Sequence, residues 1–162
     1  MSRQSGVGKQ AGVTLIEMIV VVALVAILVG ISFPAMSSGI ETLRLNSAAE
    51  SVVAFINGGL NRAERRQVVV EVTFVKRENA VWQRSAERGF ERKLELPEGI
   101  RIESVLPESP EEDATATRSF LLYPGGTVPG FGVALVNRKG AQRVVRVDPI
   151  TGVPQIESLS KK

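Results

Sequence analysis

From Val13 to Ile40 the chain reads V-T-L-I-E-M-I-V-V-V-A-L-V-A-I-L-V-G-I-S-F-P-A-M-S-S-G-I, and Glu17 is its only charged residue. About 20 helical residues rise about 30 Å, the thickness of the hydrocarbon core of a bilayer. An apolar run of this length predicts a transmembrane helix rather than a strand, in spite of its many Val and Ile residues. Because Pro34 has no backbone N–H, we expect it to bend or loosen this helix.

Three other interpretations of the apolar run are a signal peptide, a plain signal anchor and a buried helix. A signal peptide would have an apolar region of about 7–15 residues and then a small-residue cleavage site. The run is longer than that, and it is too uniform for an ordinary buried helix. Arg3 and Lys9 precede it with no acidic residue among them. This asymmetry predicts a cytoplasmic N-terminus and an exported C-terminal part.

The carboxylate of Glu17 distinguishes the segment from a plain anchor. A charged side chain at the centre of a bilayer costs about 2.5–3.5 kcal/mol on insertion scales, and such residues usually have a partner. If the chain were cut between Gly12 and Val13, Val13 would carry a free α-amine on the same helical face as Glu17. The sequence therefore predicts a pair between this amine and Glu17, within one chain or between neighbours.

The residues around Glu17 also resemble a known processing site. G-V-T-L-I-E-M, from Gly12 to Met18, is similar to the site in type IV pilins and type II secretion pseudopilins, where a basic leader ends in glycine. The resemblance implies that a prepilin peptidase/methyltransferase cuts after Gly12 and N-methylates Val13. It also implies that Glu17 pairs with the terminal amine of an adjacent subunit, and that Pro34 is the proline of the family's apolar helix. Val13 departs from the pattern, because the family usually has Phe there.

Residues 41–66 are expected to continue the helix as an amphipathic segment. The pair Gly58–Gly59 costs about 1 kcal/mol per glycine in a helix, yet it would allow close packing against a sheet. The cationic stretch 62–66 fits a helix C-terminus better than a nucleic-acid patch. An apolar stripe at helical spacing predicts the buried face; it consists of Leu45, Ala49, Val52, Ile56 and Ala63.

After residue 67 the hydrophobic period changes to two, which predicts strands. The first is expected at 68–75. In the strand expected at 100–105, strict alternation assigns Val105 to the face opposite Ile100 and Ile102. Further strands are expected at 80–84, 90–96, 119–123, 131–137, 141–148 and 153–157, with a surface loop at 106–118 and turns at 97–99, 124–126 and 138–140.

One long helix followed by short strands predicts an α+β, pilin-like fold in which the helix packs on a small antiparallel sheet. The expected segments are a cleaved basic leader, a hydrophobic transmembrane or filament-core helix, an amphipathic continuation of that helix, and a β-rich periplasmic domain. They cover residues 1–12, 13–40, 41–66 and 67–162, respectively.

The C-terminal half carries a second resemblance. F-L-L-Y-P-G-G-T at 120–127, G-V-A-L-V-N-R-K-G at 132–140 and V-V-R-V-D-P-I-T-G-V-P at 144–154 are similar to the H-type minor pseudopilins of type II secretion and the T-type fimbrial minor pilins. The resemblance implies a minor pseudopilin, anchored once in the inner membrane and then assembled into a pseudopilus. Its implied partners are the peptidase, other pseudopilins or pilins, the inner-membrane assembly platform, membrane lipid and secreted cargo.

Two alternatives stay open: a minor pilin of a type IV pilus with a role in DNA uptake, and a membrane-anchored domain without a filament role. The cations that would contact DNA are Arg138, Lys139, Arg143 and Arg146. On a strand, however, Arg143 and Arg146 point to opposite faces, and no aromatic residues alternate with them for base stacking. Once Arg3 and Lys9 leave with the leader, the net charge falls from +3 to about +1, which does not indicate a polyanion-binding protein. DNA is therefore not the expected partner.

An enzyme or a metalloprotein is not expected. The chain has no cysteine and no histidine, which excludes disulfides, zinc sites of the usual type and catalytic sites that need either residue. An acidic cluster, formed by Glu108, Glu111, Glu112 and Asp113, lacks the spacing of a calcium loop and is expected to be a solvated loop. No cofactor is expected. Trp82 is interpreted as a partly buried core residue, with a subunit contact as the alternative.

Overall fold

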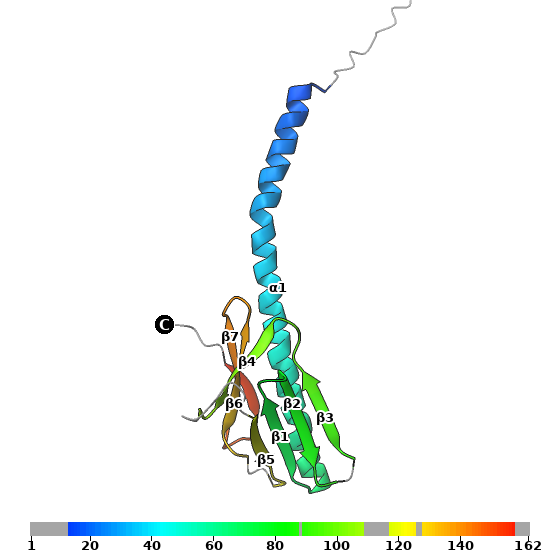
Figure 1. The fold of residues 1–162 in the computed structure, drawn as a ribbon, viewed down its shortest axis with the longest axis vertical. Helices are drawn as coiled ribbons and strands as arrows, with labels where there is room; N and C mark the ends of the chain where they lie inside the picture. The colour runs from blue at the N-terminus through cyan, green and yellow to red at the C-terminus, as the bar shows by residue number, and fades with distance from the viewer. Residues whose placement is uncertain (1–12, 88, 109–116, 126–127, 158–162) are drawn as a thin grey trace, which may run out of the picture. The chain divides into compact units, whose positions relative to one another are not determined.

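The computed structural model describes residues 13–87, 89–108, 117–125 and 128–157, with the side chains of 31–38 left out. The chain forms two compact units, of which the first ends at Ser38 and the second begins at Gly39. One helix, α1 (Leu15–Arg66), contributes to both units (Figure 1). The expected leader, residues 1–12, lies outside the described residues.

In the first unit, α1 begins at Leu15, two residues after the expected start at Val13. The helical assignment continues through Pro34, so this proline does not end the helix, and the bend expected there stays a prediction. Within the described part of the chain, no helix combines the length and the apolarity needed to cross a membrane.

In the second unit, α1 presents the predicted apolar stripe to the core. Burying a Leu, Val or Ile side chain contributes about 1.5–3 kcal/mol, so this face carries much of the helix–sheet packing. Gly58 and Gly59 lie in unbroken helix. The predicted close approach is confirmed at Gly59, where an added Cβ would lie 2.7 Å from Gln83 Nε2 and 3.1 Å from Leu122 Cδ1. All five residues of the stripe are buried, and Ala48 is a further buried residue of this face that was not predicted; the five are Leu45, Ala49, Val52, Ile56 and Ala63.

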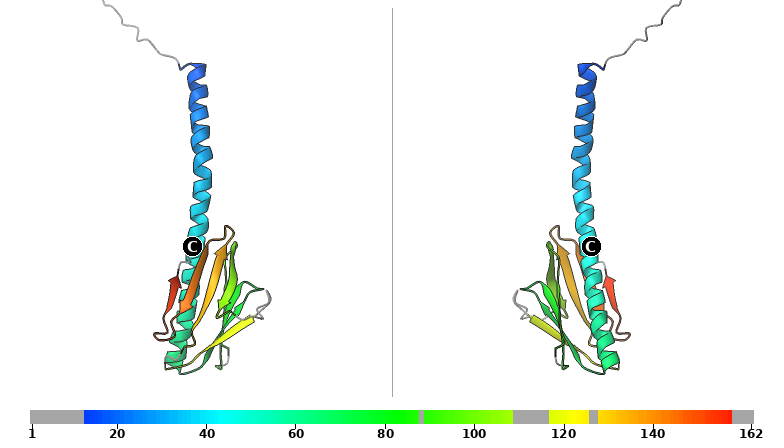
Figure 2. Two further views of the ribbon diagram at one scale, coloured as in Figure 1. Left: turned by 90° about the vertical axis from the view of Figure 1, so that its left-hand side faces the viewer. Right: turned by 90° about the vertical axis from the view of Figure 1, so that its right-hand side faces the viewer.

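The strands form two four-stranded sheets, and every pairing is antiparallel. The α+β class and the antiparallel pairing are confirmed, although the single predicted sheet is two. Figure 2 shows both sheets beside the part of α1 that belongs to the second unit. The first sheet has the order β3-β2-β1-β5 and the second β4-β6-β7-β8. The strands are β1 (Val70–Val75), β2 (Ala80–Ser85), β3 (Glu91–Glu95), β4 (Ile100–Leu106), β5 (Thr117–Leu122), β6 (Phe131–Asn137), β7 (Gln142–Val147) and β8 (Pro154–Glu157).

The end of α1 explains why β1 begins at Val70 instead of residue 68. Gln67 has a positive φ of 55°, and the N–H of Val68 donates to the carbonyl of Ala63 at 3.3 Å. This is the Schellman arrangement that closes many helices, here with Gln where glycine is usual. Residues 67–69 therefore complete the helix end and the turn into the sheet.

Two further predictions about strands are wrong. β5 begins at Thr117, two residues earlier than expected, so the loop predicted at 106–118 is shorter at both ends. In β4 the pairing with β6 shifts between Ile102 and Ser104. This bulge leaves the intervening Glu103 unpaired and returns Val105 to the buried side, together with Ile100 and Ile102.

The two sheets meet at an aromatic cluster and at one asparagine. The rings of Phe120 and Phe131, which come from different sheets, stack with their centroids 4.5 Å apart. Asn79, in the turn between β1 and β2, reaches the edge of β4. Its Nδ2 donates to the carbonyl of Ile100 at 2.6 Å, and its Oδ1 accepts from the N–H of Ile102 at 3.0 Å. The side-chain amide of Asn79 thus occupies the place of a neighbouring strand at this edge.

Candidate processing and assembly site

The start of α1 is capped by Thr14. The carbonyl of Thr14 accepts the first helical bond, from the N–H of Met18 at 3.2 Å, and its Oγ1 accepts from the N–H of Glu17 at 3.3 Å. The first N–H groups of a helix lack partners within the helix, and a threonine cap of this kind contributes about 1 kcal/mol. The cap places Val13 just outside the helix, where the residue is 62% exposed.

Glu17 occupies the third helical position, and its side chain is exposed. Thr14-Leu-Ile-Glu17 has the pattern of a capping box, a signal that the spacing argument from Val13 to Glu17 overlooked. Among the described residues, the carboxylate of Glu17 has no ion pair or hydrogen bond of its own. It is therefore available to a cation from outside this part of the chain.

The electrostatics of the helix start favour a carboxylate at this position. The N-terminus of a helix carries the equivalent of about half a positive charge, which attracts anions and repels cations. A new α-amine on Val13 would add a positive charge at this same end. A negative charge in the first turn would offset both, so the position of Glu17 suits a chain that begins at Val13. Gly12 lies outside the described residues, so the expected cut stays a prediction.

The helix that follows the cap is apolar on all sides. From Leu15 to Val29, the large apolar side chains are each 50–81% exposed. A helix that is hydrophobic all round is normally covered by other apolar groups, and an exposed apolar surface of this extent marks an interaction site. This segment is therefore an interaction surface rather than part of the core.

The four cations considered for DNA do not form one group. Arg138 pairs with Glu98, and Arg146 Nε lies 3.3 Å from Glu157 Oε2. Arg143 is partly buried, where its Nε donates to Asn46 Oδ1 of α1 at 3.0 Å. Lys139 lies in the tight turn between β6 and β7, where its N–H donates to Asn137 Oδ1 at 3.0 Å. The three arginines thus have separate partners within the fold.

Trp82 is partly buried, as predicted, but it does not belong to the hydrophobic core. It lies on the face of β2 opposite the buried Val81 and Gln83, and the cations of Arg84 and Lys93 lie 5.2 and 5.0 Å from the centre of its ring. A hydrogen bond to Glu95 raises the pKa of Lys93 and lowers that of the Glu95 carboxyl. Trp82 therefore belongs to a charged outer surface.

The acidic cluster lies largely outside the described residues, with Glu108 as its only described member. Across the described ranges, no group of three or more Asp and Glu residues is placed to hold a metal ion.

In a comparison with protein families, residues 7–33 match the family described as prokaryotic N-terminal methylation motif. The matched range contains Gly12, Val13 and Glu17, the residues that carried the first resemblance. No curated protein and no solved structure matched the chain.

The motif supports a type IV pilin-like protein with a membrane-anchored N-terminus. Proteins with this motif are processed by prepilin peptidase and assemble with other pilins, and they are structural subunits rather than enzymes. The match covers the N-terminal segment alone and does not distinguish a pseudopilin from a pilus subunit.

Proposed function

We propose that this protein is a minor pseudopilin of a type II secretion system, which is inserted in the inner membrane, cut after Gly12 and assembled into the periplasmic pseudopilus. The observation that carries the proposal is the capped start of α1. Thr14 closes the helix, Val13 lies outside it, and the unpaired Glu17 carboxylate follows in the first turn. The C-terminal half resembles both minor pseudopilins and fimbrial minor pilins, so a minor pilin of a type IV pilus is the alternative.

In this proposal the cut changes the electrostatics of the helix start. Before cleavage, Val13 contributes a neutral peptide group. After cleavage its α-amine is a cation, which Glu17 of a neighbouring subunit binds when the two apolar helices pack side by side. A bare amine within an apolar bundle would be costly, and its pairing with Glu17 removes that cost. Helices that pack out of register leave both charges unpaired, so the pair also selects the register.

The exposed apolar helix is proposed to have two successive surroundings. Lipid covers it while the subunit waits in the inner membrane, with the N-terminus in the cytoplasm and residues 67–162 in the periplasm. Helices of other pseudopilins cover it in the filament. The sheets then face outward, where they contact other minor subunits or secreted cargo.

Processing is tested by intact-mass measurement of the full chain, produced in cells with a prepilin peptidase. The expected product lacks residues 1–12 and carries one methyl group on Val13. Replacement of Gly12 by Val should block the cut, whereas the matched control Gly8→Val, in the leader, should leave it unchanged. A mature protein that still begins at Met1 or Ser2 would refute the proposal.

The role of Glu17 is tested with Glu17→Gln, which retains the size of the side chain but removes its charge. We expect normal cleavage and a loss of about tenfold or more in the amount recovered with sheared filaments, since a buried amine would lack its partner. Glu50→Gln, at an exposed position of the same helix, is the control and should assemble normally. Equal recovery of the two variants would remove the assembly role.

The choice of system is tested by deletion of the gene in its own host. A secretion pseudopilin predicts that folded exoproteins accumulate in the periplasm while surface pili and DNA uptake persist. The opposite result would favour the pilus alternative.

A further inference from the structure

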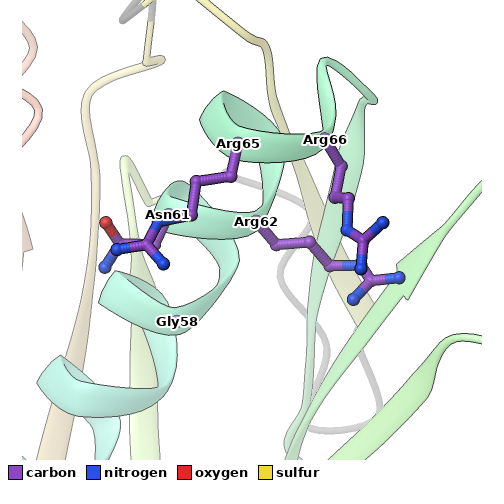
Figure 3. A pocket seen from close by; sticks show the side chains of 5 residues that line it. All are labelled: Gly58, Asn61, Arg62, Arg65 and Arg66. Carbon is purple, nitrogen blue, oxygen red and sulfur yellow. The ribbon is translucent and has the colours of Figure 1, made fainter.

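Three arginines near the C-terminal end of α1 line a hollow in the second unit. The hollow has a volume of about 420 Å³, and we call it the arginine hollow; its lining residues are Gly58, Asn61, Arg62, Arg65 and Arg66. Figure 3 shows the side chains of Arg62 and Arg66 directed toward one another, while that of Arg65 extends toward Asn61. Guanidinium groups thus form much of its wall.

A fourth arginine approaches the arginine hollow from the first sheet. Arg92 lies in β3, and an added Cβ on Gly58 would lie 4.0 Å from its Nη1 and would meet no closer atom. Arg92 pairs in register with Gln83, whose Nε2 donates to the carbonyl of Phe55 in α1 at 2.6 Å. Both side chains therefore lie on the face of the sheet that α1 covers, and the hollow extends from α1 toward β3.

Little negative charge faces these four guanidinium groups. Arg62 pairs with Glu87 and lies over the ring of Phe90 at 3.6 Å, yet its buried Nε has no hydrogen-bond partner. Among the described residues, the other three arginines have neither an ion pair nor a hydrogen bond from their side chains. The unpaired donors indicate a partner that supplies acceptor oxygens.

This surplus of positive charge is more than a helix C-terminus needs. The helix dipole favours cations within the last turn only, and Arg92 belongs to a strand. Guanidinium groups that converge on one hollow repel each other unless an anion lies between them. Their planar pairs of N–H groups bind carboxylates in a two-point arrangement. Charge complementarity therefore favours a partner that presents several carboxylates.

The edge of β3 offers main-chain groups to the same partner. In the first sheet β3 is the outermost strand, and its only described neighbour is β2 (Figure 1). The N–H of Ser85 donates to the carbonyl of Phe90 at 3.4 Å, and such bonds recur at every second residue of an antiparallel pair. The intervening residues of β3 therefore direct their N–H and C=O groups away from β2; they are Glu91, Lys93 and Glu95.

A strand edge of this kind can pair with an extended segment of another chain. In an extended segment, side chains on one face recur at every second residue, about 6.8 Å apart. A segment added beside β3 would direct alternate side chains to the face of the sheet that carries Arg92 and α1. Carboxylates at those positions would reach the arginine hollow, whereas carboxylates at the intervening positions would point away from it.

We propose that the arginine hollow and the edge of β3 together bind an acidic, extended segment of another protein, which adds to the first sheet and presents carboxylates at alternate positions. The main-chain bonds supply affinity, and the arginines select the sequence. The inference rests on the proposed function, in which the sheets contact other minor subunits or secreted cargo. It deepens that function by naming the chemistry of the contact.

The test is fluorescence anisotropy of labelled peptides with the full chain in a mild nonionic detergent. One octapeptide alternates Thr and Glu, so all of its carboxylates lie on one face of a strand. The other has the same composition in the order T-T-E-E-T-T-E-E, which divides the carboxylates equally between the two faces. The alternating peptide should bind about tenfold more tightly, because the other peptide leaves half of its carboxylates outside the hollow.

Substitution of arginines tests the arginine hollow itself. Arg65→Gln with Arg66→Gln should weaken binding of the alternating peptide about tenfold, because it removes two cations that face the carboxylates. The matched control is Arg101→Gln with Arg138→Gln, which removes the same charge from exposed positions in β4 and in the turn after β6. The control should change the affinity by less than about twofold.

Lys93→Pro tests the edge of β3. It removes an N–H that points away from β2, and proline is tolerated at such positions of an edge strand. Lys93→Thr is the control, since it removes the same charge but keeps the N–H. The alternating peptide should bind about fivefold more weakly to Lys93→Pro than to Lys93→Thr.

Three results would overturn the inference. The first is equal affinity of the protein for the two peptides, and the second is equal weakening by the two pairs of arginine substitutions. The third is a DNA duplex that displaces the alternating peptide and needs the same arginines, since the hollow would then bind nucleic acid. Equal affinities of the two Lys93 variants would overturn the addition of a strand to β3.

The same preparations separate this inference from the proposed function. Their intact masses report cleavage after Gly12. Cleaved protein that does not discriminate between the peptides refutes only the contact at the arginine hollow, whereas uncleaved protein refutes the pseudopilin proposal.

Discussion

Substitution of Asn79 tests how the two sheets are joined. It is a non-glycine residue with a positive φ of 52°, and its side chain makes two hydrogen bonds to the main chain of β4, at 2.6 and 3.0 Å. Asn79→Ala removes both bonds and keeps a Cβ in a left-handed conformation. Asn79→Gly removes the same bonds but also removes the steric strain of a Cβ at positive φ.

The structure allows the two costs to be separated. Each lost bond costs about 1 kcal/mol, and the carbonyl of Ile100 and the N–H of Ile102 lose their partner at a partly buried position. A left-handed Ala adds about 1 kcal/mol, which Asn tolerates better and Gly avoids. We therefore expect Asn79→Ala to destabilise the protein by about 3 kcal/mol and Asn79→Gly by about 2 kcal/mol.

The assay is urea unfolding of the full chain in a mild nonionic detergent, followed by tryptophan fluorescence. Trp82 is the only tryptophan and lies in β2, three residues after Asn79, so its emission reports on this junction. Loss of less than about 0.5 kcal/mol in both variants, the spread of ordinary surface substitutions, would refute the role of the two bonds. Equal losses of stability in Asn79→Ala and Asn79→Gly would refute the predicted cost of the left-handed conformation.

Three further predictions concern the packing of α1 and can be measured in the same unfolding assay. Gly59→Ala should destabilise by about 1–3 kcal/mol, because its Cβ would overlap Gln83 and Leu122. Gly58→Ala, whose Cβ would meet only Arg92 Nη1 at 4.0 Å, should stabilise by about 0.5–1 kcal/mol, and a matching loss there would contradict the packing argument. Gln67→Gly should stabilise by about 0.5–1 kcal/mol, since glycine suits the φ of 55° at the end of α1; an unchanged midpoint would show that Gln67 is not strained. Asn46→Ala should cost about 1.5 kcal/mol, because it removes the acceptor for Arg143, whereas Asn46→Asp should keep most of the stability; similar losses in both would argue against this bond.

The helix and most strands could be predicted because their signals are local. An unbroken apolar run, a stripe from Leu45 to Ala63 and alternation along β1 are all visible in neighbouring residues. The errors at residue 68 and at Val105 arise from a helix end closed by Gln without glycine and from a bulge at Glu103. Neither has a strong sequence signal, since both depend on the partner strand or on a main-chain conformation that Gln rarely adopts.

In the candidate site, too, some features could be predicted from the sequence and others could not. Gly12, Val13 and Glu17 are recognisable by spacing alone, and the cap at Thr14 was readable from Thr-x-x-Glu. The approach of Arg92, in β3, to Gly58 of α1 was not predictable, because it depends on the order of the strands. The bonds of Asn79 to β4 have the same origin, in that they join residues from different sheets.

Among the described residues, the buried core runs from Leu45 to Val147, so it lies in the second unit. Among the described residues, the apolar side chains between Leu15 and Val29 take no part in the core that the two sheets share. The surroundings of that segment can therefore change independently of the domain. Lipid can be exchanged for protein around it without a change in the folding equilibrium of the domain. In the proposed function, the subunit therefore moves from lipid into the filament at the cost of that transfer alone.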